Sequence, residues 1–558
     1  MATNSKLNLF KEVMETSVGN LDSFSSLQTY LLFLSYSNKH NIDNSLLDRA
    51  IKTAKNLFHP LNKDDSLVKS IKRIDDLNLS DEDYEDLALS TLTANSLRYF
   101  DNGFDYNISL LAIKLLQIKS SDTVYDLGSG NGGFLSLASK LGRDEFSRPR
   151  VIGDEINPGE VELSEIILTM CRANFKINVT NALNNLKTPE FTKAYAFPPF
   201  GTNSKNELVK FNTNKNIFNS RTSLEWGFIY KLITNMPKDG KVVALIPEFI
   251  LFKNYDKEIR EFIVSNKYLE GLISLPSRAV KWTGIKLYMA IFSNNNESFK
   301  YFDAEKELAK YSIRDLSKVS TVETIFNLYN NAQQRFTIKD INPIDFDLTP
   351  STIANTKLNE LIKDGVKLSD ICEINRGEQG TISKFNDVIT SEATGYKILT
   401  SSNIENGLIN FDQLKSIKEG EKYDKFTLKK GDMVVTTKST TVKFAVLLDE
   451  PKDKIIVTGG MYFIRPISNK IDSTFLKIFF ESKLGKGIIS SCLKGTIIKA
   501  LNYTQFSEIR VPCPSIAKQK ELSKKYNSLL LVYDGLKQEL DATSEKLNSF
   551  YEDNYQEE

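Results

Sequence analysis

The sequence predicts an α/β protein with a helical N-terminal domain, a doubly wound parallel-sheet domain, a mainly β domain and a long C-terminal helix. Three patterns support this prediction. Short β-branched runs alternate with helical stretches after about residue 105, short strands separated by glycine turns follow residue 367, and a heptad repeat ends the chain. At 558 residues the chain is also too long for one hydrophobic core. We therefore expect domains at 1–100, 101–320 and 367–515, a connector at 321–366 and the long helix at 516–558.

The composition narrows the classes of protein that fit. The net charge of +1 excludes a strongly basic, histone-like DNA binder, although a local basic face would suffice to bind phosphates. The cysteines lack the spacing of metal ligands and both histidines lie near the N-terminus, so we expect no metal site and no histidine-based triad. The sequence contains no apolar run of membrane-spanning length and no signal-peptide pattern. We expect a cytoplasmic protein with reduced thiols and no membrane contact.

Residues 5 to about 100 predict a set of helices. Leu27, Tyr30, Leu31 and Leu34 recur at the spacing of one helix face. Three acidic residues at 81–83 favour the start of another helix, because negative charge stabilises a helix N-terminus. No catalytic pattern occurs in this region, so we expect a helical cap or a docking bundle.

Seven short apolar runs in the next region predict the strands of one sheet. They lie at 123–125, 151–153, 177–179, 194–196, 241–246, 269–275 and 287–292. Helical stretches such as 223–234 and 257–264 separate them, and this alternation predicts a mostly parallel sheet with helices on both faces. Ligands in such sheets bind at the carboxyl ends of the strands. The residues that follow each run are therefore the candidates for a binding site.

A glycine-rich loop, Asp-Leu-Gly-Ser-Gly-Asn-Gly-Gly-Phe at 126–134, follows the first run. Glycines make a tight turn there and let the backbone approach a ligand closely. The second run leads to Glu155, whose carboxylate can accept hydrogen bonds from ribose hydroxyls. These features fit a dinucleotide enzyme and a methyltransferase alike. The candidate cofactor-binding residues are Asp126, Gly128, Gly130, Gly132 and Glu155.

The fourth run leads into a second motif, Phe197-Pro198-Pro199-Phe200. This motif resembles the Asn-Pro-Pro-Phe signature of DNA methyltransferases that act on amino groups. In that family the Asn side chain and the first Pro carbonyl accept hydrogen bonds from the target amine, and the aromatic residue stacks on the flipped base. Two adjacent prolines stiffen the backbone that presents the carbonyl. The resemblance makes Phe197, Pro198, Pro199 and Phe200 the candidate catalytic residues.

Further motifs occur at Gly153–Asn157, Glu225–Phe228, Ile246–Glu248, Ile273–Ser277 and Thr283–Ile285. With these motifs the chain resembles, over about residues 90–300, the modification subunit of type I restriction–modification systems. The resemblance implies a Rossmann-like methyltransferase fold, S-adenosylmethionine as cofactor and adenine in double-stranded DNA as substrate. It also implies that Asn181, which follows the third run, lies near the adenine ring of the cofactor.

The chain departs from the family pattern at three places. Phe197 replaces the usual Asn or Asp, so one acceptor for the target amine is missing, a loss that commonly costs about a hundredfold in rate. Asn181 replaces an acid, but its amide oxygen can still accept a hydrogen bond. Residues 99–107 lack the Tyr-Thr-Pro common there, so we do not expect cofactor contacts from them. Three explanations for Phe197 stay open: an inactivated variant, a natural pseudo-enzyme that positions DNA for a partner, and an enzyme that uses another acceptor.

A second set of motifs lies at Leu368–Gly377, Leu428–Asp432, Phe463–Pro466 and Ile509–Pro512, followed by Gln519–Leu522. With these motifs, residues 367 to about 515 resemble a target-recognition domain of type I specificity subunits. A polar loop at 436–441 suits contacts with phosphates and base edges. The lysines that cluster at 425–443 and at 483–499 would, on charge alone, indicate only a solvated surface. With the resemblance, the candidate DNA-binding residues are Lys429, Lys430, Lys438, Lys443 and Lys494.

The last predicted helix carries an apolar heptad from Leu522 to Phe550. A sustained heptad predicts a coiled coil, and the alternative is an amphipathic helix packed on its own domain. Specificity subunits usually carry two recognition domains, whereas one is visible here. Reading a split target would then require a homodimer joined through this helix, on a palindromic and interrupted DNA site. A separate restriction subunit would be a further partner.

The leading prediction is a site-specific DNA adenine methyltransferase with built-in target recognition, in a restriction–modification or related host-defence system. The alternative is a methyltransferase-fold DNA-recognition protein that is catalytically impaired by Phe197. A dinucleotide oxidoreductase explains the glycines but explains neither the Pro198-Pro199 loop nor residues 367–515. A nuclease fusion lacks support, because the N-terminal region shows no acid–lysine cleavage constellation.

Overall fold

The computed structural model divides into two compact units, Met1–Thr349 and Pro350–Glu558. The structure describes residues 4–18, 25–58, 64–95, 104–184, 188–205, 207–212, 216–276, 279–280, 283–310, 316, 318–343, 345–350, 352–353, 362, 365–378, 385, 388–405, 407–418, 420–437, 442–467, 470–494 and 500–550.

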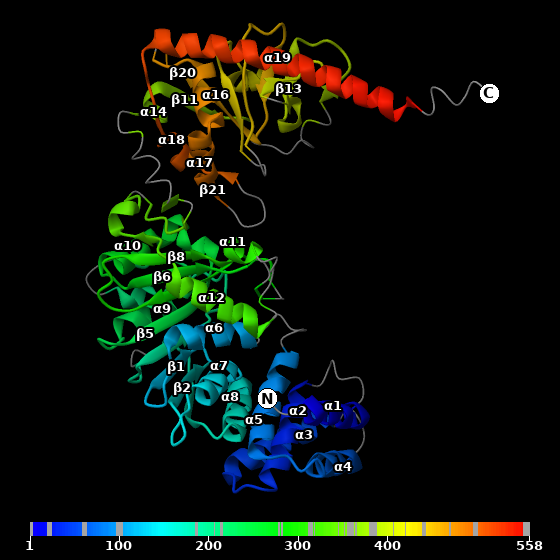
Figure 1. Ribbon diagram of the computed structural model, residues 1–558, viewed down its shortest axis with the longest axis vertical. Helices are drawn as coiled ribbons and strands as arrows, with labels where there is room; N and C mark the ends of the chain where they lie inside the picture. Colours follow the sequence, from blue (N-terminus) through cyan, green and yellow to red (C-terminus); the bar gives the residue numbers. More distant parts are fainter. Residues whose placement is uncertain are drawn as a thin grey trace, which may run out of the picture. The chain divides into compact units, whose positions relative to one another are not determined.

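Five helices form the N-terminal part of the first unit (Figure 1). They are α1 (Asn4–Val18), α2 (Ser25–Ser37), α3 (Asn44–Phe58), α4 (Asp64–Asp75) and α5 (Asp81–Asn95). The largely apolar α2 is buried along most of its length, because α3, α4 and α5 all pack against it. The buried carboxylate of Glu85 on α5 pairs with Arg148 at 2.8 Å and with Arg143 at 3.2 Å, which ties this helix to the segment before β2. The region expected to be helical is helical in the structure, and it belongs to the same compact unit as the sheet that follows it.

A nine-stranded sheet forms the centre of the first unit, in the order β3-β2-β1-β4-β5-β7-β6-β8-β9. The strands are β1 (Thr123–Leu127), β2 (Arg150–Glu155), β3 (Asn174–Val179), β4 (Lys193–Ala196), β5 (Lys241–Pro247), β6 (Leu269–Ser274), β7 (Leu287–Phe292), β8 (Phe299–Asp303) and β9 (Arg335–Phe336). The first five strands are parallel, whereas β7 runs antiparallel between β5 and β6. The seven predicted apolar runs correspond to β1–β7, so the predicted α/β fold is confirmed.

The order of the strands reverses at β1, which pairs in parallel with β2 on one side and with β4 on the other. At such a reversal the loops after two neighbouring strands diverge and leave a crevice. The glycine-rich loop follows β1 and the Phe197 loop follows β4. Topology therefore brings the two sequence motifs to the same crevice.

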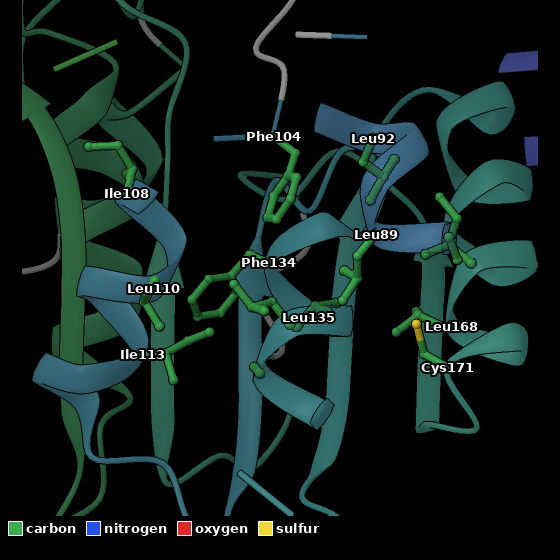
Figure 2. Close-up of a cluster of buried hydrophobic side chains, with 14 of the residues drawn as sticks. Leu89, Leu92, Phe104, Ile108, Leu110, Ile113, Phe134, Leu135, Leu168 and Cys171 are labelled. Atoms are coloured by element: carbon green, nitrogen blue, oxygen red, sulfur yellow. The ribbon is translucent and has the colours of Figure 1, made fainter. Parts of the chain in front are cut away.

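Helices cover the sheet and set the position of the glycine-rich loop. They are α6 (Tyr106–Leu116), α7 (Gly133–Leu141), α8 (Pro158–Met170), α9 (Glu225–Thr234), α10 (Lys257–Ser265), α11 (Ala304–Ala309) and α12 (Val319–Asn331). Figure 2 shows Leu110 and Ile113 of α6, Phe134 of α7 and Leu168 of α8 in one buried cluster. The Phe134 ring also stacks on Tyr195 of β4, with 4.2 Å between ring centroids. Because α7 starts directly after the glycines, this packing holds their loop over the sheet.

The segment expected to be a connector, 321–366, belongs in large part to the first unit. It contains most of α12 and all of β9, which pairs with β8 at the edge of the sheet. Further on, the buried guanidinium of Arg260 donates to the carbonyl oxygens of Phe346 at 2.7 Å and Asp345 at 2.8 Å. The described part of 321–349 therefore belongs to the first unit, through β9 at the edge of the sheet and through the hydrogen bonds to Arg260 on α10. The sequence suggested a connector because Asn342, Pro343 and Asp345 interrupt any helical or strand period. The strand β9 has two residues, which is too short for a periodic pattern.

The second unit is mainly β with a few helices, as the sequence predicts. Its two larger sheets have the orders β11-β20-β17-β18 and β12-β16-β13-β19. The strands are β10 (Val366–Lys367), β11 (Cys372–Arg376), β12 (Ile389–Thr390), β13 (Tyr396–Leu399), β14 (Ile404–Glu405), β15 (Leu408–Ile409), β16 (Lys415–Ile417), β17 (Met433–Thr436), β18 (Phe444–Val446), β19 (Lys454–Val457), β20 (Met461–Pro466), β21 (Leu493–Lys494), β22 (Ala500–Leu501) and β23 (Arg510–Val511). The helices are α14 (Leu368–Ile371), α16 (Ser473–Glu481), α17 (Lys483–Ser491), α18 (Tyr503–Ser507) and α19 (Ile516–Asn548).

The long helix α19 has two different halves. Near its start, Ser523 donates to Asp472 at 2.5 Å and the Tyr526 hydroxyl accepts from Lys477 at 3.0 Å, so these turns pack on α16. Further along, the apolar heptad side chains are exposed, for example Leu536 at 61% and Leu540 at 67%. The first turns of α19 therefore pack on their own domain, as an amphipathic helix does. The later turns present an apolar face that is exposed to solvent.

Candidate active site

Three glycines of the loop after β1 adopt positive φ angles. These are 93° at Gly128, 51° at Gly130 and 77° at Gly132, a backbone region that side chains with a Cβ rarely adopt. Gly132 also caps the start of α7, and a Cβ built on it would lie 2.3 Å from the Ser164 hydroxyl. A Cβ on Gly130 would meet nothing within 4 Å, because this residue faces open space. Packing therefore leaves no room for a side chain at Gly132, whereas the open space at Gly130 can receive a ligand.

A cavity of about 370 Å³ lies at the carboxyl ends of β1, β2, β3 and β4. It is lined by backbone and side chains from all four loops and from the starts of α6 and α9. Sequence-predicted residues in the lining are Asp126, Gly128, Gly130, Glu155, Asn181, Phe197 and Pro199. The structure thus brings the glycine-rich loop, the acid after β2, the residue after β3 and the Phe197 loop to one cavity.

Glu155 is tied to the glycine-rich loop. Its Oε2 atom accepts a hydrogen bond from the Gly130 amide at 2.9 Å, and its Oε1 atom accepts one from the Asn157 amide at 2.8 Å. Each carboxylate oxygen can accept two hydrogen bonds, and each oxygen of Glu155 accepts one here. The carboxylate is therefore oriented at the cavity wall and keeps acceptor capacity for hydroxyl groups of a ligand.

Asp126 is the penultimate residue of β1 and is almost fully buried. Its Oδ1 atom has no hydrogen-bond partner among the described residues, and the nearby Ser129 hydroxyl has none there either. Burial, together with the negative charge of Glu155, holds the pKa of the Asp126 carboxyl well above its usual range. A buried carboxyl without a partner costs free energy unless a donor reaches it, so the cavity floor is suited to a ligand that brings hydrogen-bond donors or positive charge.

Asn181 follows β3 and turns the chain into the cavity wall. Its Oδ1 atom accepts a hydrogen bond from the Leu183 amide at 3.0 Å. The next residue, Ala182, has its carbonyl oxygen bound by the buried ammonium of Lys231 on α9 at 2.5 Å. Two hydrogen bonds therefore fix the turn that carries Asn181.

The Phe197 loop follows β4 with its two aromatic rings close together, 5.4 Å between centroids at an interplanar angle of 44°. Phe197 and Pro199 line the cavity. Pro198 is buried and Phe200 is half-buried, and neither is in the cavity lining. The loop therefore presents an aromatic and a proline surface to the cavity.

Two features of the site were not expected from the sequence. Phe104 and Asp105 line the cavity, although no contact was expected from residues 99–107; Asp105 caps α6 by accepting from the Ile108 amide at 3.0 Å. Residues 99–103 lie outside the described part of the chain.

The second feature is Glu225, which is fully buried and accepts a hydrogen bond from the Gly201 amide at 3.0 Å. Glu225 is part of one of the motifs that resemble the modification subunit, and no role was predicted for it.

The candidate DNA-binding lysines differ in their surroundings. Lys429 and Lys430 are exposed on a turn whose shape depends on Asp432, because the buried Asp432 carboxylate accepts from the Lys429 amide at 2.8 Å and from Arg465 at 2.6 and 2.9 Å. Lys443 donates to the Ile404 carbonyl at 2.9 Å, so it also supports β14. Lys438 and the side chain of Lys494 lie outside the described residues.

Two further findings concern the described part of the chain. No helix there is long and apolar enough to cross a membrane. No group of three or more His, Cys, Asp and Glu side chains is placed there to hold a metal ion.

Two family models match the chain in succession. Residues 105–363 match the family described as N-6 DNA Methylase, and residues 363–540 match the family described as Type I restriction modification DNA specificity domain. The boundary between the matches falls close to the boundary between the two units.

Individual relatives are distant. The chain is 24% identical over 258 residues to the type I restriction enzyme MjaVIII specificity subunit of Methanocaldococcus jannaschii, covering 45% of this chain and 59% of the relative. It is 21% identical over 302 residues to the type I restriction enzyme MpnII methylase subunit of Mycoplasma pneumoniae, covering 48% of this chain and 55% of the relative. The chain thus spans a little over half the length of these curated relatives.

Among solved structures, one similar chain is the type I restriction-modification system methyltransferase subunit from Streptococcus thermophilus. It has a TM-score of 0.47 and 14% identity, and the match covers 62% of this chain and 97% of that chain.

Proposed function

Since the chain joins an N-6 DNA methylase domain to a type I restriction modification DNA specificity domain, we propose that it is a site-specific DNA methyltransferase. It transfers a methyl group from S-adenosylmethionine to the amino group of adenine, and its second unit selects the DNA sequence. The observation that carries this proposal is the single cavity lined by the glycine-rich loop, Glu155 and the Phe197 loop.

The residues of the cavity fit S-adenosylmethionine. The open space at Gly130 admits a ligand against the backbone, and the buried Oδ1 atom of Asp126 lacks a donor among the described residues. Glu155 would accept hydrogen bonds from the ribose hydroxyls, and Asn181 would contact the adenine ring. When bound, this cofactor supplies an electrophilic methyl group on a positively charged sulfur.

The Phe197 loop would receive the target adenine. Phe197 cannot accept a conventional hydrogen bond, so the Pro198 carbonyl is the acceptor that this loop retains for the target amine. The paired rings of Phe197 and Phe200 offer an apolar surface for a base that has left the DNA stack. We expect the reaction to proceed at a reduced rate, because one of the two acceptors is missing.

A dinucleotide oxidoreductase would use the glycine-rich loop and Glu155 in the same way. It does not explain why a loop with two prolines between two aromatic residues lies at the same cavity. Nor does it account for a second unit that matches a DNA specificity domain. The methyltransferase accounts for both units with one substrate.

The second unit would bind double-stranded DNA through the exposed Lys429 and Lys430, with Lys438, Lys443 and Lys494 as further candidates. The exposed apolar half of α19 would join two copies of the chain in a coiled coil. A homodimer of this kind reads an interrupted palindrome, with one half-site for each copy. A separate restriction subunit is a further proposed partner, and the cytoplasm is the proposed location.

Sequencing that detects N6-methyladenine tests the function. Unmethylated genomic DNA would be incubated with the full chain and S-adenosylmethionine, and a matched sample would receive the Glu155→Ala variant. We expect N6-methyladenine confined to one interrupted palindromic sequence, and far less of it with the variant. Methylation of cytosine, or an adenine signal without sequence preference, would refute the proposal.

A further inference from the structure

Helix α9 contacts two loops of the proposed active site, the Phe197 loop after β4 and the turn after β3. The contacts are made by buried charged side chains at the two ends of the helix. Glu225 lies in its first turn and Lys231 in its last turn. Relative exposure is 0% for Glu225 and 2% for Lys231. Burial of charged groups costs free energy unless they are bound to a partner, so such residues in a helix require a reason.

Glu225 supports the Phe197 loop. Its Oε1 atom accepts from the Gly201 amide at 3.0 Å, directly after Phe200. Backbone hydrogen bonds extend the same attachment, since the Leu224 amide donates to the Thr202 carbonyl at 3.0 Å. The helix start is itself anchored, because buried Asp256 accepts from the Ser223 amide at 2.8 Å. The loop after β4 is therefore held to a fixed helix end.

Lys231 supports the turn after β3. Its ammonium donates to the carbonyl oxygen of Ala182 at 2.5 Å, next to Asn181. A second lysine, Lys210, donates to Asn184 at the other end of this turn at 2.6 Å. Burial lowers the pKa of Lys231, and the negative charge of nearby Asp154 opposes that shift. The turn is thus bound to the far end of the same helix.

We propose that Glu225 and Lys231 are positioning residues, through which α9 sets the loop for the target base and the turn for the cofactor in one fixed arrangement. This inference rests on the proposed function and adds two residues that do not line the cavity. Each residue acts on one loop, so their loss should have separate consequences. Loss of Glu225 should affect the reaction with DNA, and loss of Lys231 should affect cofactor binding.

Amide hydrogen exchange tests the attachment directly on the full chain. In Glu225→Ala, the Phe200–Ser204 amides should exchange about tenfold faster, because the Gly201 amide loses its acceptor and the segment loses a hydrogen bond that holds it to α9, a loss worth about this factor. Glu225→Gln keeps an acceptor oxygen for Gly201 and should keep these amides protected. In Lys231→Met, the Ala182–Asn184 amides should exchange faster, and the Phe200–Ser204 amides should not. Unchanged exchange in the β5 strand controls for general loosening of the unit.

Binding and rate measurements test the consequence. Glu225→Ala should lower kcat by about tenfold with the Kd for S-adenosylmethionine unchanged, whereas Lys231→Met should weaken that Kd by about tenfold. If Glu225→Ala does not fold, Glu225→Met removes the acceptor while filling the space. Equal effects of both variants on both loops, or no effect on either, would overturn the inference. Exchange and cofactor binding need no methyl transfer, so an inactive wild-type chain would refute the proposed function without deciding this inference.

Discussion

Gly132 and Ser164 leave no room for a side chain between them: a Cβ on Gly132 would lie 2.3 Å from the Ser164 hydroxyl oxygen and 3.0 Å from its Cβ. The backbone of Gly132 also has φ of 77°. The contact joins the start of α7 to α8, and through them it fixes the glycine-rich loop over the sheet.

Gly132→Ala should therefore destabilise the first unit, by roughly 1–3 kcal/mol, because both the clash and the backbone strain are unfavourable. Gly130→Ala is the matched control, since its Cβ meets nothing within 4 Å and carries only the strain of a positive φ. Thermal unfolding should show the larger loss for Gly132→Ala. Calorimetry measures the affinity for S-adenosylmethionine. Gly130→Ala should lose more affinity for a given loss of stability than Gly132→Ala does. Equal losses of stability would contradict the packing described at Ser164.

Glu225 should make stability depend on pH. Burial raises its pKa to about 7 from 4.5, so the folded chain binds a proton more tightly than the unfolded chain does. The resulting stabilisation is complete below about pH 4.5 and is lost as the pH rises to about 7. Relative to Glu225→Gln, the wild-type free energy of unfolding should fall by about 3 kcal/mol over this window. Chemical denaturation at several pH values measures the difference; parallel curves for the two proteins would mean that Glu225 stays ionised when buried.

Lys429 and Lys430 should contribute to DNA affinity without regard to sequence. They are exposed on a turn fixed by Asp432, which suits contacts with phosphate groups. Replacing both with alanine should reduce the slope of log K against log salt by about 2, since each phosphate contact contributes about 1. Lys524→Ala, an exposed lysine on α19, is the control. Binding titrations at several salt concentrations give the slope, and an unchanged slope would exclude this turn from the DNA interface.

The exposed half of α19 should mediate self-association. Leu536→Lys with Leu540→Lys places charge on apolar positions that are 61% and 67% exposed in the single chain. We expect sedimentation to change from dimer to monomer while the unfolding temperature of the second unit stays the same, because these side chains contribute little to its core. Asp541→Asn on the same helix should leave the dimer intact. A monomeric wild-type chain would contradict this prediction.

Sequence patterns predicted the parts of the fold that rest on local periodicity. The runs that became β1–β7 are continuous apolar segments, and the glycine-rich loop has a composition that only a tight turn requires. The strand β9 and the docking of 345–348 on Arg260 escaped prediction because they depend on contacts between distant residues. The same holds for Glu225 and Lys231, since their roles lie in single hydrogen bonds across the fold. Candidate site residues were predictable where a motif carries them, and supporting residues were not.

We infer that this chain transfers a methyl group to adenine despite Phe197. Single-turnover transfer from radiolabelled S-adenosylmethionine to unmethylated DNA, with the present sequence beside Phe197→Asn, gives the decisive comparison. We expect labelled adenine with both proteins, and a rate about a hundredfold higher for Phe197→Asn, because that variant restores the missing acceptor. Labelling by Phe197→Asn alone, with equal cofactor and DNA binding by both proteins, would show that the chain with Phe197 is a recognition protein without transfer activity.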